Sequence, residues 1–241
     1  CEIETYGLSE KADLRAADME LIKGKGYLGV KYHAKGLVDC LVEIHVPGRF
    51  SVYNSLTAIA VCHHFKVTTE NIQSALRAAK VKGRIEIVKV SDDFTLMIDY
   101  AHNAMSLKSL LSTLQEYEPG RLVCLFGCGG NRSKLRRYEM GEVSGNMADL
   151  TIITSDNPGY EEPQAIINDI KIGMSKTDGK FVEIADRKEA IRYAIAHAKP
   201  ADVIVLAGKG HEDYQEICGV KHHMDERELI AEVVAELKSE A

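Results

Sequence analysis

From Phe94 onward, short continuous apolar runs alternate with stretches of helical spacing, and this alternation constrains the fold more than any other feature. Continuous apolar runs are typical of parallel strands, because both faces of such strands are covered. Leu107, Leu110, Leu111 and Leu114 form one helical stripe between two of the runs. The pattern predicts a doubly wound α/β domain with a mainly parallel sheet. Its strands are expected at residues 96–99, 122–126, 150–154, 181–184 and 203–207.

The chain before Phe94 follows a different pattern, in which alternating and helical stretches are mixed. Strands are expected over residues 39–46 and from Arg84, and helices over residues 52–65 and from Thr68. A chain of 241 residues is long enough for two domains that each have a core. We therefore expect one domain over residues 1–93 and a second over residues 94–241.

Polar or glycine-rich loops follow four of the expected strands. They begin at Asp99, Gly127, Asp156 and Gly208. In open α/β sheets, ligands bind where the carboxyl ends of the strands converge. A glycine-rich backbone before a helix is an anion site, and Arg132 adds a guanidinium that suits a carboxylate or a phosphate. Because Glu212 suits an ammonium group, the loops together predict a site for a small zwitterion.

Each loop on its own also has a structural explanation. His102 is compatible with a helix N-terminus, and residues 156–159 have the composition of a plain turn. The phosphate-binding pattern G-x-x-x-x-G-K-[ST] occurs nowhere in the chain. The indication of function therefore comes from the group of loops rather than from any one of them.

Charge and composition exclude several classes of protein. The net charge of −6 argues against nucleic-acid binding, and no apolar stretch approaches the ~20 residues of a membrane span. The cysteines include no C-x-x-C pair, which fits a reduced, cytoplasmic chain. Because the chain begins with Cys1 rather than Met, we expect a processed product or a piece of a longer protein.

Six segments of the chain, in this order, resemble the Mur ligase family. They are PGRFSVYNSLTAIAV, GRIEIV, DYAHN, FGCGGNR, SDNP and AGKGHEDYQE. The resemblance covers essentially the whole chain. It is closest to the branch that adds the third residue, a diamino acid, to UDP-N-acetylmuramoyl-L-alanyl-D-glutamate (the MurE type). The GKGHEDYQ and DNP segments are specific to this branch, whereas the other features also fit sister ligases and folylpolyglutamate synthetase.

The resemblance implies an ATP-dependent ligase of peptidoglycan synthesis with three domains. This chain would comprise the C-terminal portion of the central ATP-binding domain, followed by a Rossmann-like C-terminal domain that binds the amino acid. A P-loop, magnesium ligands and a carbamylated lysine, and with them the catalytic residues, are expected upstream. In the implied reaction, the acceptor carboxylate becomes an acyl phosphate, and the neutral amine of the diamino acid attacks it. We expect this chain alone to be catalytically inactive.

The resemblance also implies roles for individual residues and for partners. The ATP-binding residues would be Asn54, Arg84, Asp99 and His102. The amino-acid-binding residues would be Arg132, Asp156, Asn157, Gly208 and Glu212. Lys209 and His211 either shape their loop or face solvent. The implied cofactors are ATP and Mg²⁺, with no metal ligand in this chain, and the implied partners are the UDP-linked dipeptide and a diamino acid. Neither nucleic acid nor a membrane is implied, and we expect a cytoplasmic monomer.

One departure from the resemblance concerns the identity of the amino acid. In the diaminopimelate enzymes, the residue after DNP is typically an arginine that grips the distal carboxylate, whereas this chain has Gly159. Loss of such a contact weakens binding by ~2–5 kcal/mol. L-Lysine has no distal carboxylate, and Glu161 and Glu162 would suit its distal ammonium. Both meso-diaminopimelate and L-lysine therefore stay candidates.

Two other classes of function also remain open from the sequence. One is a different amide ligase of the Mur or folylpolyglutamate type. The other is a non-catalytic module that binds an amino acid or a nucleotide without turnover.

Overall fold

The computed structural model describes residues 3–240, so Cys1 lies outside the described residues. The chain divides into two compact units, Cys1–Val81 (unit 1) and Lys82–Ala241 (unit 2). This division precedes the expected boundary after residue 93. The difference arises because β5 (Glu86–Val88) pairs antiparallel with β6 (Thr95–Asp99) and so belongs to the sheet of unit 2.

Unit 1 is a four-stranded sheet with two helices. Its strands are β1 (Tyr6–Gly7), β2 (Leu14–Gly24), β3 (Tyr27–Gly36) and β4 (Cys40–Ile44), in the order β1-β2-β3-β4. Strand β1 runs parallel to β2, and the other neighbours are antiparallel. The helices α1 (Arg49–His64) and α2 (Thr69–Ala78) bury Leu56, Ile59 and Ile72 in one core with the sheet. Strand β4 and both helices were predicted, whereas the long β2–β3 hairpin was not.

Unit 2 alternates strands and helices as the sequence predicted. After β5 and β6 come α3 (Ala104–Gln115), β7 (Arg121–Phe126), α4 (Lys134–Met147), β8 (Leu150–Ile153), α5 (Pro163–Met174), β9 (Phe181–Glu183), α6 (Arg187–Ala196), β10 (Asp202–Ala207), β11 (Tyr214–Ile217), β12 (Val220–His223) and α7 (Glu226–Glu240). The five predicted strands correspond to β6, β7, β8, β9 and β10. The small antiparallel hairpin of β11 and β12 was not predicted.

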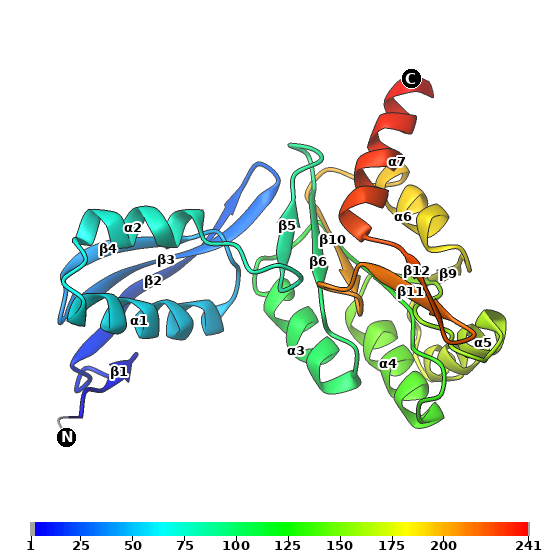
Figure 1. The fold of residues 1–241 in the computed structure, drawn as a ribbon, viewed down its shortest axis with the longest axis horizontal. Helices are drawn as coiled ribbons and strands as arrows, with labels where there is room; N and C mark the ends of the chain where they lie inside the picture. Colours follow the sequence, from blue (N-terminus) through cyan, green and yellow to red (C-terminus); the bar gives the residue numbers. More distant parts are fainter. Residues whose placement is uncertain (1–2, 241) are drawn as a thin grey trace. The chain divides into compact units, whose positions relative to one another are not determined.

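The main sheet of unit 2 has six strands in the order β5-β6-β10-β7-β8-β9. Every pairing except that of β5 with β6 is parallel. Figure 1 shows α3, α4 and α5 on one face of this sheet and α6 and α7 on the other. The predicted doubly wound, mainly parallel α/β architecture is therefore confirmed. Because β10 inserts between β6 and β7, the loops after these three strands meet at one edge of the sheet.

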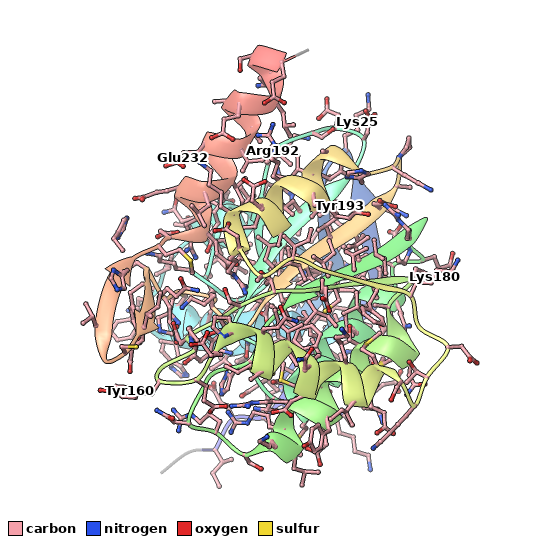
Figure 2. The ribbon with its side chains drawn as sticks, turned by 90° about the vertical axis from the view of Figure 1, so that its right-hand side faces the viewer. Lys25, Tyr160, Lys180, Arg192, Tyr193 and Glu232 are labelled. Carbon is pink, nitrogen blue, oxygen red and sulfur yellow. The ribbon has the colours of Figure 1, made fainter. Side chains whose placement is uncertain are left out.

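Burial explains why these strands form. Every residue of β6 and of β10 is buried, as expected for parallel strands covered on both faces. On one face, Ile204 and Leu206 of β10 pack with Ile191 of α6 and Ile230 of α7. Figure 2 shows Arg192 and Glu232 on these two neighbouring helices. No helix in the described part of the chain is long and apolar enough to cross a membrane.

Candidate functional site: a cavity at the carboxyl edge of the sheet

A cavity of about 610 Å³ lies in unit 2, where the loops after β6, β7, β8 and β10 converge. Its wall is completed by Tyr214 and Glu216 of β11. Six of the residues singled out in the sequence line it, namely His102, Arg132, Asp156, Asn157, Gly208 and Glu212. The strand order therefore brings together loops that are far apart along the chain.

Three other predicted residues lie outside the lining of this cavity. Asn54 is exposed on α1 in unit 1. Arg84 and Asp99 belong to unit 2 but are absent from the cavity wall. The residues assigned to the amino acid thus share one cavity, whereas only His102 of the nucleotide set reaches it.

Lys209 is the functional-site residue whose place the sequence left open. Its side chain is fully buried, and its ammonium donates to Asn157 Oδ1 at 2.8 Å, to Glu212 Oε2 at 3.0 Å and to the carbonyl of Tyr214. Asn157 Nδ2 also donates to Glu212 Oε2, at 2.9 Å. Lys209 therefore fixes the positions of two predicted ligand-binding side chains. Its place between two glycines is the signal that the sequence offered.

The glycines of this loop are required by close approach. Gly208 has φ of +112°, and a Cβ there would lie 2.8 Å from Asp156 Oδ2. Gly210 has φ of +53°, and a Cβ there would lie 2.6 Å from Cβ of Tyr100. Larger residues would push the loop away from the cavity wall. The glycines therefore keep Lys209 and Glu212 in place.

The loop after β7 is held by a second buried cation, Arg137, which is 1% exposed. Its guanidinium donates to both carboxylate oxygens of Glu161 at 2.8 Å, to Asp169 Oδ2 at 2.9 Å and to the carbonyl of Gly129 at 3.2 Å. Glu161 also accepts the backbone N–H of Asn131 at 2.7 Å. These contacts join the loop after β7 to the loop after β8.

The same contacts set the state of Glu161. The hydrogen bonds from Arg137, and next that from the Asn131 N–H, lower the pKa of Glu161 to about 2. Its carboxylate is therefore ionised and already bound within the protein. The idea that Glu161 receives a distal ammonium is not supported, because Arg137 occupies both of its oxygens. Glu162 is exposed where α5 begins.

Gly159 closes the far wall of the cavity through backbone contacts. Its N–H donates to the carbonyl of Glu216 at 3.1 Å, and its carbonyl accepts from the N–H of Cys218 at 2.7 Å. Its φ of +59° is left-handed, a region that glycine adopts without strain. Tyr160, labelled in Figure 2, follows it and is largely exposed beside the β11–β12 hairpin. Glycine at this position thus suits the left-handed backbone conformation, independently of any ligand.

The nucleotide candidates in unit 2 surround Tyr100. The Arg84 guanidinium lies 5.1 Å from the centroid of the Tyr100 ring, and the His102 ring lies 4.7 Å from it. His102 Nδ1 donates to the carbonyl of Tyr100 at 2.8 Å. An exposed cation beside aromatic rings fits a nucleoside phosphate, because rings stack on bases and a guanidinium pairs with phosphate. Within residues 3–240, no group of three or more His, Cys, Asp or Glu side chains is arranged to hold a metal ion.

Asp99 is engaged within the fold. It is 7% exposed, and it accepts the N–H of Ile85 at 2.9 Å and that of Ala101 at 2.8 Å. Burial raises its pKa, and the two backbone hydrogen bonds oppose this rise. Ile85 has φ of +41°, so the carboxylate also stabilises a turn that an isoleucine rarely adopts. Asp99 therefore shapes the backbone next to Arg84.

Arg227 ties this turn to the loop after β10. Its guanidinium donates to both oxygens of Glu86, to the carbonyl of Gly210 at 3.0 Å and to Asp225 Oδ1 at 2.9 Å. Glu86 in turn accepts the N–H of Gly83 at 2.7 Å. One side chain thus connects the start of unit 2, the glycine-rich loop and the beginning of α7.

A buried ion pair supports the strand ends beneath the cavity. Arg187 and Glu226 are 2% and 0% exposed, and Arg187 donates to Glu226 Oε1 at 2.8 Å. Arg187 also donates to the carbonyl of Ser155 at 3.0 Å and to that of Ala207 at 3.2 Å, at the ends of β8 and β10. Burial raises the pKa of Glu226, and Arg187 opposes this rise. The pair holds in place the two loops that carry Asp156 and Gly208.

Comparison with known proteins places this geometry in a family. Residues 83–210 match the family described as Mur ligase, glutamate ligase domain. A UDP-N-acetylmuramoyl-L-alanyl-D-glutamate--2,6-diaminopimelate ligase of Caldanaerobacter subterraneus is 43% identical over 237 residues, which are 98% of this chain and 48% of that protein. Ligase 1 of the same name from Clostridium acetobutylicum is 42% identical over 236 residues, 97% of this chain and 48% of that protein.

Solved structures agree with the sequence relatives. A structure of a UDP-N-acetylmuramoyl-L-alanyl-D-glutamate--2,6-diaminopimelate ligase has a TM-score of 0.75 at 30% identity, covering 98% of this chain and 48% of that one. The UDP-N-acetylmuramate-alanine ligase of Thermotoga maritima shares the fold, with a TM-score of 0.68 at 16% identity over 99% of this chain and 48% of that one. The chain spans about half the length of the curated relatives it matches. It therefore belongs to the Mur ligase family and corresponds to the C-terminal part of such a ligase.

Proposed function

We propose that the ligase containing this chain joins a diamino acid to UDP-N-acetylmuramoyl-L-alanyl-D-glutamate in an ATP-dependent step of peptidoglycan synthesis. The observation that carries the proposal is the single cavity that gathers Arg132, Asn157 and Glu212. Relatives at about 40% identity that are named for this reaction with 2,6-diaminopimelate support it. In this proposal, the chain supplies the site of the incoming amino acid.

The chemistry of the cavity suits a zwitterion. Arg132 would bind a carboxylate of the incoming amino acid through its guanidinium. Glu212, Asp156 and the backbone at Gly208 would hold an ammonium group. Because Lys209 and Asn157 already fix Glu212, this carboxylate is preorganised before the ligand arrives. The amino acid would thus be presented with one amine directed out of the cavity.

Amide formation needs that amine in its neutral form. Of the proposed cofactors, ATP would supply the phosphoryl group that converts the acceptor carboxylate to an acyl phosphate, with ADP as the leaving group, and Mg²⁺ would neutralise the phosphate charge. The amine nitrogen attacks the acyl carbon and loses a proton, a C–N bond forms, and phosphate departs as the C–O bond breaks. Alignment of the two reactants in the cavity lowers the entropic part of the barrier.

The proposed ATP-binding site is less complete in this chain than the proposed amino-acid site. Arg84 and His102, beside Tyr100, would contact the ribose and phosphate region, with Asp99 holding their turn. Asn54, on α1, would contact adenine. The catalytic residues and the magnesium ligands would lie in the rest of the ligase. We further propose that this ligase acts as a cytoplasmic monomer.

Release of phosphate from ATP by the ligase containing this chain tests the proposal. The acceptor is UDP-N-acetylmuramoyl-L-alanyl-D-glutamate, and L-lysine, meso-diaminopimelate and L-glutamate are offered in parallel. We expect release only with a diamino acid, and its loss in Glu212→Gln. Absence of release with every amino acid would refute the proposed reaction. The chain alone is expected to give no release in the same assay.

A different acid–amino-acid ligase is the second candidate. It is favoured by the description of the matched family, a glutamate ligase domain, over residues 83–210. Release that depends on L-glutamate rather than on a diamino acid would select this alternative. Saturable amino-acid binding by the ligase without any release would instead indicate a non-catalytic binding module.

A further inference from the structure

Four cationic side chains lie close together where the loop after β7 enters α4. They are Arg132, Lys134, Arg136 and Arg137. Two of them are neutralised within the protein. Arg137 pairs with Glu161 and Asp169, and Lys134 Nζ lies 3.5 Å from Asp169 Oδ2. The remaining two, Arg132 and Arg136, line the cavity.

These two cavity arginines have no partner for their charge. Across residues 3–240, neither guanidinium donates a hydrogen bond or forms an ion pair. Arg136 is also half-buried in the first turn of α4. Arg132 is exposed to solvent, whereas the Arg136 guanidinium is partly removed from water without a partner, which favours an anion beside Arg136. Two separate guanidiniums match two separate carboxylates.

The surroundings of Arg136 favour an anion as well. The N-cap residue of α4, Ser133, makes no side-chain capping hydrogen bond, and the first turn of α4 has no acidic residue. The Arg136 N–H donates to the Ser133 carbonyl at 3.2 Å, but the missing side-chain cap and the uncompensated helix dipole leave partial positive charge at this end of α4. Both effects add to the guanidinium of Arg136, because Arg136 belongs to this turn.

The opposite wall supplies the complementary charge. Asp156, Glu212 and Glu216 line it, and Lys209 neutralises Glu212 in part. The carboxylate of Glu216 has no hydrogen-bond or ion-pair partner among the described residues. A ligand with two carboxylates and an ammonium group satisfies both walls. A ligand with a single carboxylate leaves one of the two arginines unpaired.

We propose that Arg136 binds the second carboxylate of the incoming amino acid and thereby selects diaminopimelate over lysine. The inference rests on the proposed ligase function and adds the residue that discriminates between the two amino acids. Arg136 takes over the contact that Gly159 cannot make, because glycine has no side chain and its backbone closes the cavity wall. The ligase would thus prefer an amino acid with a second carboxylate although no arginine follows the DNP segment.

The test compares Arg136→Gln with the parent ligase and with Lys134→Gln. Lys134 is a matched control, since it is a cation in the same turn that does not line the cavity. Amino-acid-dependent phosphate release is measured with meso-diaminopimelate and with L-lysine, at saturating ATP and acceptor. Calorimetric titration of the ligase with each amino acid gives a second readout that needs no turnover.

We expect Arg136→Gln to raise KM and Kd for meso-diaminopimelate about 30-fold, the factor for ~2 kcal/mol lost with one partly buried charge contact. The values for L-lysine should stay within about twofold, and Lys134→Gln should behave as the parent. Equal effects on both amino acids, no effect on either, or a parent that prefers L-lysine would each overturn the inference. Absence of phosphate release with intact, Arg136-dependent binding of diaminopimelate would instead refute the proposed function and leave this inference supported.

Discussion

The two units of this chain bury different kinds of side chain. Unit 1 buries an apolar core, and the only buried polar side chains among residues 3–81 are hydroxyls, such as that of Ser55. In unit 2, Arg137, Arg187, Lys209 and Glu226 are all almost completely buried. Within residues 3–240, every buried charged side chain belongs to unit 2.

The difference shows what a binding cavity requires of its fold. Buried charges are costly unless each is paired and hydrogen-bonded, so they are rarely retained for stability alone. In unit 2, Arg137, Arg187 and Lys209 each join two or more loops at the carboxyl edge of the sheet. In unit 1, the sheet and its two helices enclose a core of apolar side chains, and apolar packing suffices there. The following predictions test this contrast.

The largest effect is expected from Arg187→Ala in unit 2. Glu226, which is 0% exposed, would lose its only ion-pair partner among residues 3–240. The free energy of unfolding should fall by ~3–5 kcal/mol, as when one partner of a buried ion pair is removed. Urea unfolding followed by circular dichroism measures it. The double variant Arg187→Met with Glu226→Leu should lose less free energy of unfolding than the single variant. A loss below ~1 kcal/mol in Arg187→Ala would mean that unit 2 does not depend on its buried charges.

A pH-dependent effect is expected from Glu161→Gln. The folded pKa of Glu161 is lowered from 4.5 to about 2, so its stabilisation is present above about pH 4.5 and is lost as the pH falls towards about 2. Because its side chain is 31% exposed, solvent screening limits the effect to ~1 kcal/mol at pH 7. Unfolding at pH 7 and near pH 2 should show the difference only at pH 7. Glu162→Gln changes an exposed neighbour and is the control. If both variants change the free energy of unfolding equally at pH 7, the ion pair of Glu161 with Arg137 does not stabilise the fold.

Gly159→Ala should have an effect of similar size that does not depend on pH. An alanine would be held at φ of +59° with its Cβ 3.2 Å from Asn131 Nδ2. A left-handed non-glycine residue costs ~1 kcal/mol or more, which thermal unfolding can detect. Gly129→Ala is the control in the same loop system, because its Cβ would meet nothing closer than 3.8 Å. A neutral result at Gly159 would show that the loop can rearrange.

The smallest effect is expected in unit 1, from Tyr32→Phe. The Tyr32 hydroxyl lies 2.7 Å from Ser55 Oγ, which keeps its bond to the carbonyl of Val52 in the variant. The loss should be ~0.5–1 kcal/mol. Burial raises the pKa of Tyr32 to about 12, so the loss should be the same at every pH between about 5 and 9. A loss that changes over this range would mean that unit 1 also contains a coupled charge.

Differences in burial also explain which strands could be predicted from the sequence. Strands β6 and β10 were predicted because both faces are buried, which leaves continuous apolar runs. Strand β2 was missed because charged side chains such as Arg15, Glu20 and Lys23 interrupt its apolar pattern. Its pairing with β3 also shifts register between Ala17 and Glu20. Every residue of β12 is exposed, so no apolar pattern marks it.

For the candidate site, the location of the loops could be predicted from the sequence, but the contacts between them could not. Glycine-rich loops after parallel strands indicated that Arg132, Asn157 and Glu212 would share one edge of the sheet, and all three line one cavity. The burial of Lys209 and the pairing of Arg137 with Glu161 were not predictable, because they depend on contacts between residues far apart in sequence. Local patterns therefore locate loops, whereas the partners of their charges require the fold.

The hydrogen bonds of Arg227 also fix the backbone at the start of unit 2. Unit 2 begins at Lys82, and the Gly83 N–H is already bound to Glu86, which Arg227 holds against Gly210. A Cβ at Gly83 would lie 2.1 Å from the His211 nitrogen, so little space is left for the backbone to rotate there. The first residues of unit 2 are therefore held against the loop around Gly210 from Gly83 onward. Segment 83–86 and the loop around Gly210 should therefore move together within unit 2.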